Sequence, residues 1–436
     1  MKILIITRSS WDNMNSLGNT MSNIWEGWDS DKIANIYCRN ARPNNNVCKL
    51  YYSICDKDLI KSIFNKKYIV GKVLKDAFLK NTGLKENENS KMEKRIYDYF
   101  RNSRFVLFYW LQEIIWKIGK WKNMQFDDFL SKFKPDIIFS ACFPSFYTHE
   151  LLWYIQKKTK AKVILFHADD YLSYKGMGGT ILERINRKIR SKIIETSSKK
   201  ADLNFCISEK QKDEYERKLG IKTKLLYKGK EFNEFPNSIY QIRNKIINIV
   251  YTGSILNGRW RTIYELAKAI KKINENTKDK KYNLSIYSQY KPKNKVLKLL
   301  DIKDVSKFYG KINSNQIPEV YRNSDILLHV ESFDNKEKLE TRLSFSTKIV
   351  DYLSSGRCIM AIGWSKSASI EYLAKNDAAV IANSKEEIFE KLKEIINDPE
   401  IINIYANKAW NCGRRNHQIE NVKSKFVNDI SSVLNN

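Results

Sequence analysis

Short apolar runs rich in β-branched and aromatic residues alternate with helical segments along the chain, and this alternation limits the possible folds more than any other feature. The runs cover residues 2–7, 32–38, 135–140, 162–167, 201–208, 247–254, 282–288, 305–310, 324–330, 357–362 and 378–382. They do not alternate strictly between apolar and polar residues, so we expect both faces of each strand to be buried, as in parallel sheets between helices. The sequence therefore predicts an α/β fold with doubly wound sheets.

There are too many strands for one ordinary sheet, and the polar segment 232–245, which contains Pro236, separates two groups of them. A chain of 436 residues is also long enough for two or three domains, each with its own core. We therefore predict two Rossmann-like domains, over residues 1–238 and 239–412. The remaining segment, 413–436, is expected to form a helix that can return to the N-terminal domain.

The net charge of +28 favours an anionic partner, such as a membrane surface or an anionic substrate. Basic residues are interleaved with acidic ones, and there is no Arg-rich tract, zinc-finger spacing or aromatic-glycine RNA motif, so no nucleic-acid partner is expected. Seven scattered cysteines without a CxxC pair indicate reduced thiols and a cytoplasmic location. Four histidines, none closely spaced, argue against a structural zinc site. No run reaches the ~20 apolar residues that span a bilayer.

The segment 104–121, RFVLFYWLQEIIWKIGKW, is apolar and aromatic but interrupted by charged and amide side chains. One interpretation is an interfacial amphipathic helix that binds the protein to a membrane surface. The other is a helix packed on the N-terminal sheet, with its Trp and Tyr side chains in the core. We favour the packed helix, and keep peripheral membrane contact as the alternative.

Ligands of open α/β sheets bind where the strands end, so the residues after each strand are candidate site residues. Gly18 lies in a small-residue loop after the first strand, where a helix N-terminus favours a phosphate. His167 ends the strand 162–167, and Asp169 and Asp170 follow it directly; these side chains suit acid/base chemistry or binding of sugar hydroxyls. The alternative is structural: the acids cap the next element and the histidine is a satisfied polar residue.

Two arginines, Arg259 and Arg261, stand where a helix begins after the strand 247–254. The helix dipole disfavours cations at this end. A bound diphosphate reverses that cost, and Arg can contact phosphate with two donors at once. The pattern therefore indicates a phosphate site at this helix start.

The segment 344–363, SFSTKIVDYLSSGRCIMAIG, predicts a helix that ends at Gly356 and is followed by a buried strand. Ser346 or Thr347 can cap the helix, with Lys348 in its first turn and Asp351 three residues later on the same face. A nucleotide fits this arrangement, with phosphates at the helix start and ribose hydroxyls on the carboxylate. The alternative is a surface Lys348–Asp351 pair worth a few tenths of a kcal/mol. Glu331, at the end of the preceding strand, is a further candidate.

The region from GKINSNQIPEVYRNSDILLHVESF (310–333) to FSTKIVDYLSSGRCIMAIG (345–363) resembles the donor-binding region of the GT-B fold glycosyltransferases of family 4. The resemblance spans about residues 247–382 and implies two Rossmann-like domains that face a cleft. It implies a UDP- or GDP-linked sugar donor in the C-terminal domain, a saccharide acceptor in the N-terminal one, and neither metal nor cofactor. Gly253 with Arg259 or Arg261 resembles the grip on the donor diphosphate, and Gly18 matches a glycine of the first loop in position.

The sequence departs from this family at one acidic position. Family members often carry two glutamates eight residues apart, and Asp351 falls at the second position. Leu343 occupies the first and cannot replace a carboxylate, so Glu331 or Glu340 would have to substitute. His167 can correspond to a histidine that lines the cleft in some relatives.

Together these features predict a cytoplasmic glycosyltransferase that acts on a lipid-linked saccharide in surface polysaccharide synthesis. Arg259, Arg261, Lys348 and helix N–H groups would stabilise the leaving diphosphate. The resemblance favours retention of anomeric configuration, while His167, Asp169 or Asp170 could serve as the base of an inverting enzyme. Competing hypotheses are a nucleotide-sugar epimerase of the same fold and a non-catalytic basic protein that binds nucleic acid or membrane.

Overall fold

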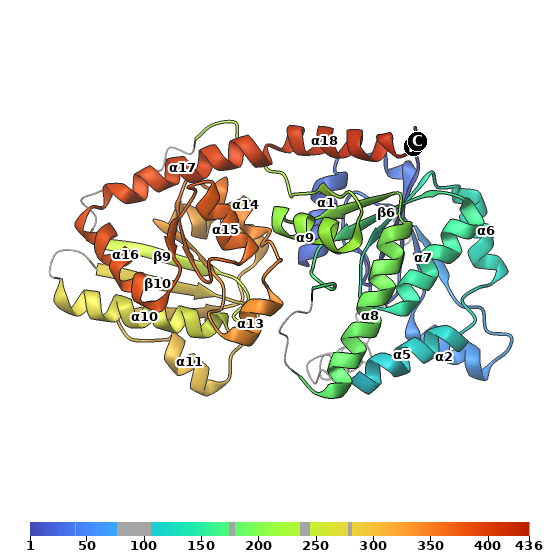
Figure 1. Cartoon of the computed structure of the whole chain (residues 1–436), viewed down its shortest axis with the longest axis horizontal. Coiled ribbons are helices and arrows are strands. Elements are labelled where there is room, and N and C mark those ends of the chain that lie inside the picture. The colour runs from blue at the N-terminus through green and yellow to red at the C-terminus, as the bar shows by residue number, and fades with distance from the viewer. Residues whose placement is uncertain (40, 76–105, 174–178, 236–244, 278–280, 436) are drawn as a thin grey trace.

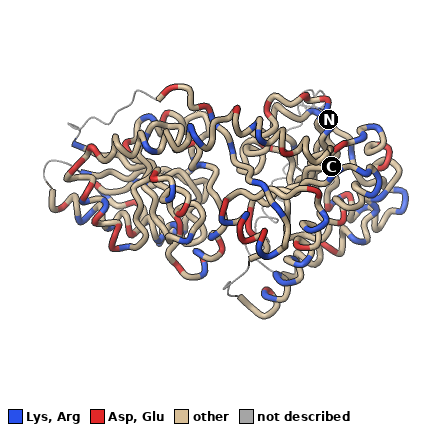
Figure 2. Tube along the Cα trace, turned by 45° about the horizontal axis from the view of Figure 1, so that its top comes forward, with Lys and Arg blue, Asp and Glu red and all other residues tan. Residues whose placement is uncertain are grey.

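The computed structural model describes residues 1–39, 41–75, 106–173, 179–235, 245–277 and 281–435. They form two α/β domains side by side along the longest axis of the molecule (Figure 1). The boundary expected at residue 238 lies outside the described residues. Lys and Arg are spread over both domains and mixed with Asp and Glu (Figure 2).

The sheet of the N-terminal domain has eight strands among the described residues, in the order β4-β3-β2-β1-β5-β6-β7-β8. The strands are β1 (Ile3–Thr7), β2 (Ile33–Tyr37), β3 (Leu50–Ser53), β4 (Lys72–Lys75), β5 (Ile137–Ala141), β6 (Lys162–His167), β7 (Leu203–Cys206) and β8 (Lys224–Leu225). All neighbours are parallel except β3 and β4. An antiparallel edge on an otherwise parallel sheet is common in doubly wound folds.

The sheet of the C-terminal domain is parallel throughout the part that the structure describes, in the order β11-β10-β9-β12-β13-β14. Its strands are β9 (Ile246–Thr252), β10 (Lys281–Tyr287), β11 (Ser306–Gly310), β12 (Ile326–Val330), β13 (Cys358–Ile362) and β14 (Val380–Ala382). The strand order reverses between β9 and β12, where pairing covers only Ile326 with Ile249 and Leu327 with Val250. The two strands therefore separate toward their carboxyl ends, which is where such a sheet binds ligands.

Helices cover both faces of each sheet (Figure 1). Those of the N-terminal domain are α1 (Ser16–Trp25), α2 (Asp56–Phe64), α5 (Val106–Ile118), α6 (Met124–Phe133), α7 (Phe146–Thr159), α8 (Ile181–Lys200) and α9 (Glu209–Leu219). The C-terminal domain contributes α10 (Arg259–Asn276), α11 (Asn294–Leu300), α12 (Ile317–Arg322), α13 (Asn335–Glu340), α14 (Lys348–Leu353), α15 (Ala368–Lys375), α16 (Lys385–Asn397) and α17 (Glu400–His417), followed by α18 (Ile419–Ser432).

The two sides of each sheet follow from the two-residue period of a strand. In β1, Ile3 and Ile5 pack in one apolar cluster, whereas Leu4 and Ile6 pack in another on the opposite face. Every residue of β1, β2, β5, β12 and β13 is buried. The α/β fold with two doubly wound parallel sheets, expected from the apolar runs, is thereby confirmed.

The last two helices cross from one domain to the other. The boundary expected at residue 412 falls inside α17, which continues to His417. α18 then packs on the N-terminal domain, where the ring of Phe426 lies 4.9 Å from that of Trp25 and 6.0 Å from that of Phe139. At the joint between α17 and α18, Gln418 pairs with Lys230 of the segment that leaves the N-terminal domain. Both chain crossings between the domains therefore run side by side.

The apolar segment around 104–121 forms α5, and its two faces differ. On the inner face Trp116 is fully buried, stacks on Tyr147 with ring centres 4.3 Å apart, and donates a hydrogen bond to Asp56. On the outer face, apolar side chains such as Leu111 and Ile114 remain about half exposed. No helix in the described part of the chain is both long and apolar enough to cross a membrane.

Candidate active site

The carboxyl ends of β9 and β12 bring Arg259 and Glu331 together at the point where the strand order reverses. Arg259, the first residue of α10, donates from Nε to the carbonyl of Val330 at 3.1 Å and from Nη2 to both carboxylate oxygens of Glu331 at 3.0 Å. Thr341 donates a third hydrogen bond to the carboxylate at 3.1 Å. Burial opposes the charge of Arg259, but Glu331 outweighs it, so the pKa of Arg259 is raised. Glu331 therefore holds a charged guanidinium at the opening between the strands.

Lys348 is a second cation at this place. It is the first residue of α14, and burial together with the charge of Arg259 lowers its pKa to about 8, against the opposing effect of Asp351. Within the described residues, Lys348 forms no ion pair at 4.0 Å or less. A lysine with this pKa is mostly charged at pH 7. Two partly buried cations thus lie near each other, and only Arg259 has an acidic partner in contact.

Asp351 is paired with lysines of the other domain and not with Lys348. Its carboxylate oxygens lie 2.9 and 3.0 Å from Nζ of Lys228, and one lies 3.7 Å from Nζ of Lys230. Lys228 is only 9% exposed. The alternative hypothesis from the sequence, a surface ion pair between Lys348 and Asp351, is therefore wrong. The sequence offered no signal for Lys228, because it is one lysine among many in a polar segment.

The start of α14 differs in detail from the expectation. Thr347 is the N-cap residue, but its side chain makes no capping hydrogen bond, and the backbone N–H of Ser346 donates to the hydroxyl of Ser369. The predicted side-chain cap at Ser346 or Thr347 is thus wrong. Gly356 adopts a φ of +67° three residues after the helix and allows the turn into β13.

Arg261 lies apart from Arg259. Its side chain is half exposed and pairs with Asp334 and, at 4.0 Å, with Glu337. The helix α10 begins after Gly258, whose φ is +74°. A Cβ at this residue would lie 2.3 Å from the Ser332 hydroxyl. Sequence reasoning missed this glycine, although a glycine before a helix-starting arginine was a usable signal.

Gly18 and Gly253, predicted to contact the donor, each have a local structural reason to be glycine. A Cβ on Gly18 would lie 2.0 Å from the carbonyl oxygen of Asp12 in its own loop. A Cβ on Gly253 would lie 2.7 Å from the hydroxyl of Tyr251. Close packing against backbone at Gly18 and against the Tyr251 side chain at Gly253 therefore leaves no room for a Cβ at either position.

The polar residues after β6 separate into two kinds. His167 is buried, its Nε2 lies 3.0 Å from the amide oxygen of Asn204, and burial lowers its pKa to about 4. Asp170 is also buried and accepts hydrogen bonds from two backbone N–H groups, at Leu172 and Ser173, and from a Tyr215 hydroxyl. Asp170 therefore fits the structural alternative of a capping acid, whereas His167 keeps its Nδ1 buried without a hydrogen-bond partner among the described residues and is not a fully satisfied histidine. Asp169 is more exposed, but its carboxylate accepts a hydrogen bond from the Tyr171 hydroxyl at 3.3 Å, and desolvation raises its pKa.

Leu343, at the position where related enzymes often carry an acid, has a different role. It is fully buried in an apolar cluster with N-terminal-domain residues that include Leu172 and Tyr215. Its carbonyl accepts a hydrogen bond from the hydroxyl of Ser208 at 2.8 Å, and the neighbouring Arg342 pairs with Glu214. The loop before α14 therefore inserts into the N-terminal domain, a contact that sequence reasoning missed. A lone leucine in a polar loop was the only available signal.

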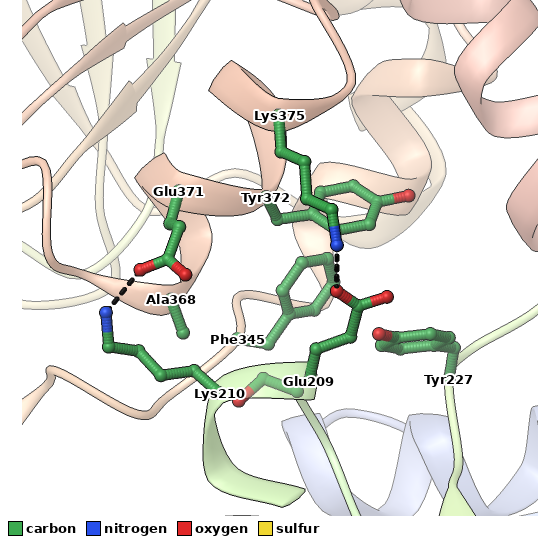
Figure 3. Close-up of a pocket in the computed structure, with 9 residues that line it drawn as sticks. Glu209, Lys210, Tyr227, Phe345, Ala368, Glu371, Tyr372 and Lys375 are labelled. Atoms are coloured by element: carbon green, nitrogen blue, oxygen red, sulfur yellow. Dashed lines mark hydrogen bonds and ion pairs between the residues drawn. The ribbon is translucent and has the colours of Figure 1, made fainter. Parts of the chain in front are cut away.

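A small pocket lies between the domains beside this loop (Figure 3). Two ion pairs cross it, Lys210 with Glu371 and Glu209 with Lys375. Its lining residues are Ser208, Glu209, Lys210, Tyr227, Phe345, Ala368, Glu371, Tyr372 and Lys375. None of the residues predicted to bind the donor lines it, so the pocket is part of the domain contact. Among the residues that the structure describes, no group of three or more His, Cys, Asp or Glu side chains could hold a metal ion.

The fold of the chain was compared with those of known proteins. Residues 261–427 match the family model described as glycosyl transferase-like. HepE from Anabaena in complex with UDP-glucose aligns over 99% of this chain and 100% of its own, with a TM-score of 0.61 and 12% identity. The fold is that of the GT-B glycosyltransferases.

Two further GT-B structures align over nearly the whole chain. Sucrose-phosphate synthase from Thermosynechococcus elongatus covers 99% of both chains with a TM-score of 0.64 and 11% identity. TarM covers 100% of this chain and 99% of its own, with a TM-score of 0.63 and 12% identity. No curated protein sequence matches the chain. The GT-B arrangement expected from the resemblance is therefore confirmed at the level of the fold.

Proposed function

We propose that this protein is a metal-independent glycosyltransferase that binds a UDP-linked sugar between β9 and β12 of its C-terminal domain. The observation that carries the proposal is the pair of cations Arg259 and Lys348 at the carboxyl ends of these strands. Keeping Lys348 charged in a partly buried site beside another cation is costly, and the phosphates of a nucleotide would offset that cost. The UDP and UDP-glucose complexes of HepE, which shares this fold, support UDP over GDP.

Each side chain of the site has a role in this proposal. Arg259, oriented by Glu331, and Lys348 bind the diphosphate and stabilise the negative charge that develops on it when the glycosidic bond breaks. Asp351 accepts hydrogen bonds from the ribose hydroxyls, which replace Lys228 as the partner of one of its two carboxylate oxygens. The side chain of Arg261 points to Asp334 on the surface and has no part in the chemistry.

We propose that the acceptor is a saccharide, lipid-linked and assembled for a surface polysaccharide at the cytoplasmic face of the membrane. Its hydroxyl would approach from the N-terminal domain, and transfer would retain the anomeric configuration, as in family 4. Because His167 and Asp170 are bound within their own domain, Asp169 is the carboxylate after β6 that an inverting reaction would use. Determining the anomeric configuration of the first product by NMR separates the two courses.

Binding and turnover of nucleotides test the proposal directly. Titration calorimetry with UDP, GDP and ADP should show selective binding of UDP, and UDP release from a UDP-sugar should increase when a saccharide acceptor is added. Lys348→Ala should weaken UDP binding about tenfold or more, since it removes a charge-assisted contact. The matched variant Lys298→Ala removes an exposed lysine of α11 and should bind UDP as the wild type does.

Three results would contradict parts of this proposal. If no nucleoside diphosphate binds, the donor site is wrong. Release of UDP at the same rate with and without any saccharide acceptor would indicate an epimerase or a hydrolase instead of a transferase. Salt-sensitive binding of RNA or DNA without nucleotide binding would indicate a basic nucleic-acid-binding protein.

A further inference from the structure

The outer face of α5 carries a row of exposed aliphatic side chains. Leu107, Leu111, Ile114 and Ile118 are between 51% and 58% exposed. Their spacing of three and four residues places them on one side of the helix. The opposite side carries Trp116, which is fully buried in the N-terminal domain. α5 is therefore fixed by its inner face and presents an apolar outer face to solvent.

α8 carries a second row of the same kind. Ile181, Ile185 and Ile189 follow one another at intervals of four residues and are 76%, 51% and 39% exposed. Leu182, which is 53% exposed, widens the row by one position. On the other side of the helix Ile194 is fully buried. An exposed row of this length on a surface helix marks an interaction site more often than scattered single apolar residues do.

The two rows lie on neighbouring helices. Arg190 of α8 forms a buried ion pair with Glu113 of α5 at 3.2 Å, and its guanidinium lies over the rings of Tyr109 and Trp110. Figure 1 shows the start of α8 next to α5 at the lower edge of the N-terminal domain. We call the combined surface the α5–α8 face. It consists of Leu107, Phe108, Leu111, Ile114, Ile118, Ile181, Leu182, Ile185 and Ile189.

Basic residues border the α5–α8 face. Arg184, Lys188 and Lys192 are exposed and, at intervals of four residues, form a row directly beside Ile185 and Ile189 on α8. The whole of α8 holds seven Lys and Arg residues but only two glutamates. Lys117, in the last turn of α5, and Lys120, just after this helix, are also exposed. Long basic side chains at the edge of an apolar helix face match the headgroups and acyl chains of an anionic bilayer.

The composition of the face favours lipid over a protein partner. Protein–protein interfaces are enriched in Tyr, Trp, Met and Arg and depleted in Lys. Here the exposed apolar residues are Leu and Ile with a single Phe, and lysine is abundant at the border.

We propose that the α5–α8 face binds the protein to an anionic lipid bilayer, with its Leu and Ile side chains among the acyl chains and its lysines and arginines at the headgroups. The inference deepens the proposed function and rests on it for its purpose, because a lipid-linked acceptor would be reached from this surface. It also adds α8, which the sequence alone did not single out. Membrane contact and donor binding involve different domains and can be measured separately.

Co-sedimentation with vesicles tests the surface on the full-length protein. Wild type should bind vesicles of phosphatidylcholine mixed with phosphatidylglycerol, bind pure phosphatidylcholine weakly, and be released by high salt. Leu111→Glu combined with Ile185→Glu should lower the partition coefficient by about tenfold or more, since a carboxylate is repelled by the anionic surface. Ile246→Glu combined with Ile404→Glu alters two comparably exposed residues of the C-terminal domain and should leave binding unchanged.

Two controls keep the outcome unambiguous. UDP affinity and melting temperature should be the same in all three proteins, so a lost donor site or an unfolded variant is recognised apart from lost membrane binding. Equal vesicle binding by the two double variants would overturn the inference, as would a wild type that does not bind anionic vesicles. A wild-type dimer in sedimentation velocity that dissociates in the Leu111→Glu, Ile185→Glu variant would also overturn it, because the face would then contact a second copy.

Discussion

Lys348 makes donor binding depend on pH in a defined direction. Its pKa in the free protein is about 8, and a diphosphate in contact would raise that pKa because it stabilises the charged form. Binding therefore takes up a proton near pH 8–9, and UDP affinity should fall by up to about tenfold per pH unit above pH 8. Calorimetry in two buffers of different ionisation heat measures this uptake. Lys348→Arg, whose charge does not titrate in this range, should show none, and pH-independent binding by the wild type would contradict the expectation.

Asp351 should contribute to nucleotide binding through its carboxylate. Removing it in Asp351→Ala should weaken UDP affinity about tenfold, because the ribose hydroxyls lose a charged acceptor. Asp351→Asn keeps one acceptor oxygen, so its UDP affinity should lie between that of the wild type and that of Asp351→Ala. Isothermal titration against UDP measures the series, with melting temperatures as the check on folding. Unchanged affinity in Asp351→Ala would leave Asp351 only its contacts with Lys228 and Lys230.

Leu343 should matter for stability more than its position in a loop suggests. It is fully buried across the domain contact, so Leu343→Ala should lower the free energy of unfolding by about 2–4 kcal/mol. Urea denaturation followed by circular dichroism measures the change. Leu256→Ala, which truncates a leucine that is 47% exposed in the C-terminal domain, should change stability by about 0.5 kcal/mol or less. Equal effects of the two variants would refute the role assigned to Leu343.

The residues of the site that lie at strand ends could be found from the sequence, and those that cross between domains could not. Arg259 and Glu331 follow apolar runs whose strand character was plain, and Lys348 begins the helix that precedes the apolar run of β13; parallel strands bring such positions to one edge. Lys228 is 123 residues from Asp351 in the chain, and Ser208 is 135 residues from Leu343. Contacts at such separations leave no local pattern, so only the fold reveals them.

At the level of elements, burial and length decided which strands the sequence revealed. β5, β12 and β13 are buried along their whole length and read as continuous apolar runs. Three strands of the N-terminal sheet were missed: β4, with exposed lysines at both ends, β8, with two residues, and β3, which is buried at Tyr51 and Tyr52 but only four residues long. For α5, burial could not be inferred from composition. Its residues suited either a helix packed in the core or a helix at a membrane surface, and the structure shows one buried face and one exposed face.

The arrangement of the whole molecule depends on α18, which belongs to the end of the chain but packs on the first domain. Phe426 is 2% exposed and touches the rings of Trp25, Phe139 and Phe205. Phe426→Ala should therefore lower the free energy of unfolding of the N-terminal domain by about 3–5 kcal/mol. Val427→Ala, at the neighbouring position that is 37% exposed, is the matched control.

Guanidinium denaturation followed by tryptophan fluorescence measures this effect. In the Phe426→Ala variant the N-terminal domain should unfold before the C-terminal domain and separate the transition into two steps. The Val427→Ala protein should unfold as the wild type does. A Phe426→Ala transition that coincides with that of the wild type would show that α18 adds little to the N-terminal core.

The course of α18 also has a consequence for synthesis of the protein. Domains at the start of a chain commonly fold while the ribosome is still translating the rest. Here the aromatic core around Trp25 and Phe139 receives Phe426 only after the C-terminal domain has been translated. The first domain therefore completes its folding together with the second. A chain cut short before α18 should accordingly be damaged in the half of the protein that was made first.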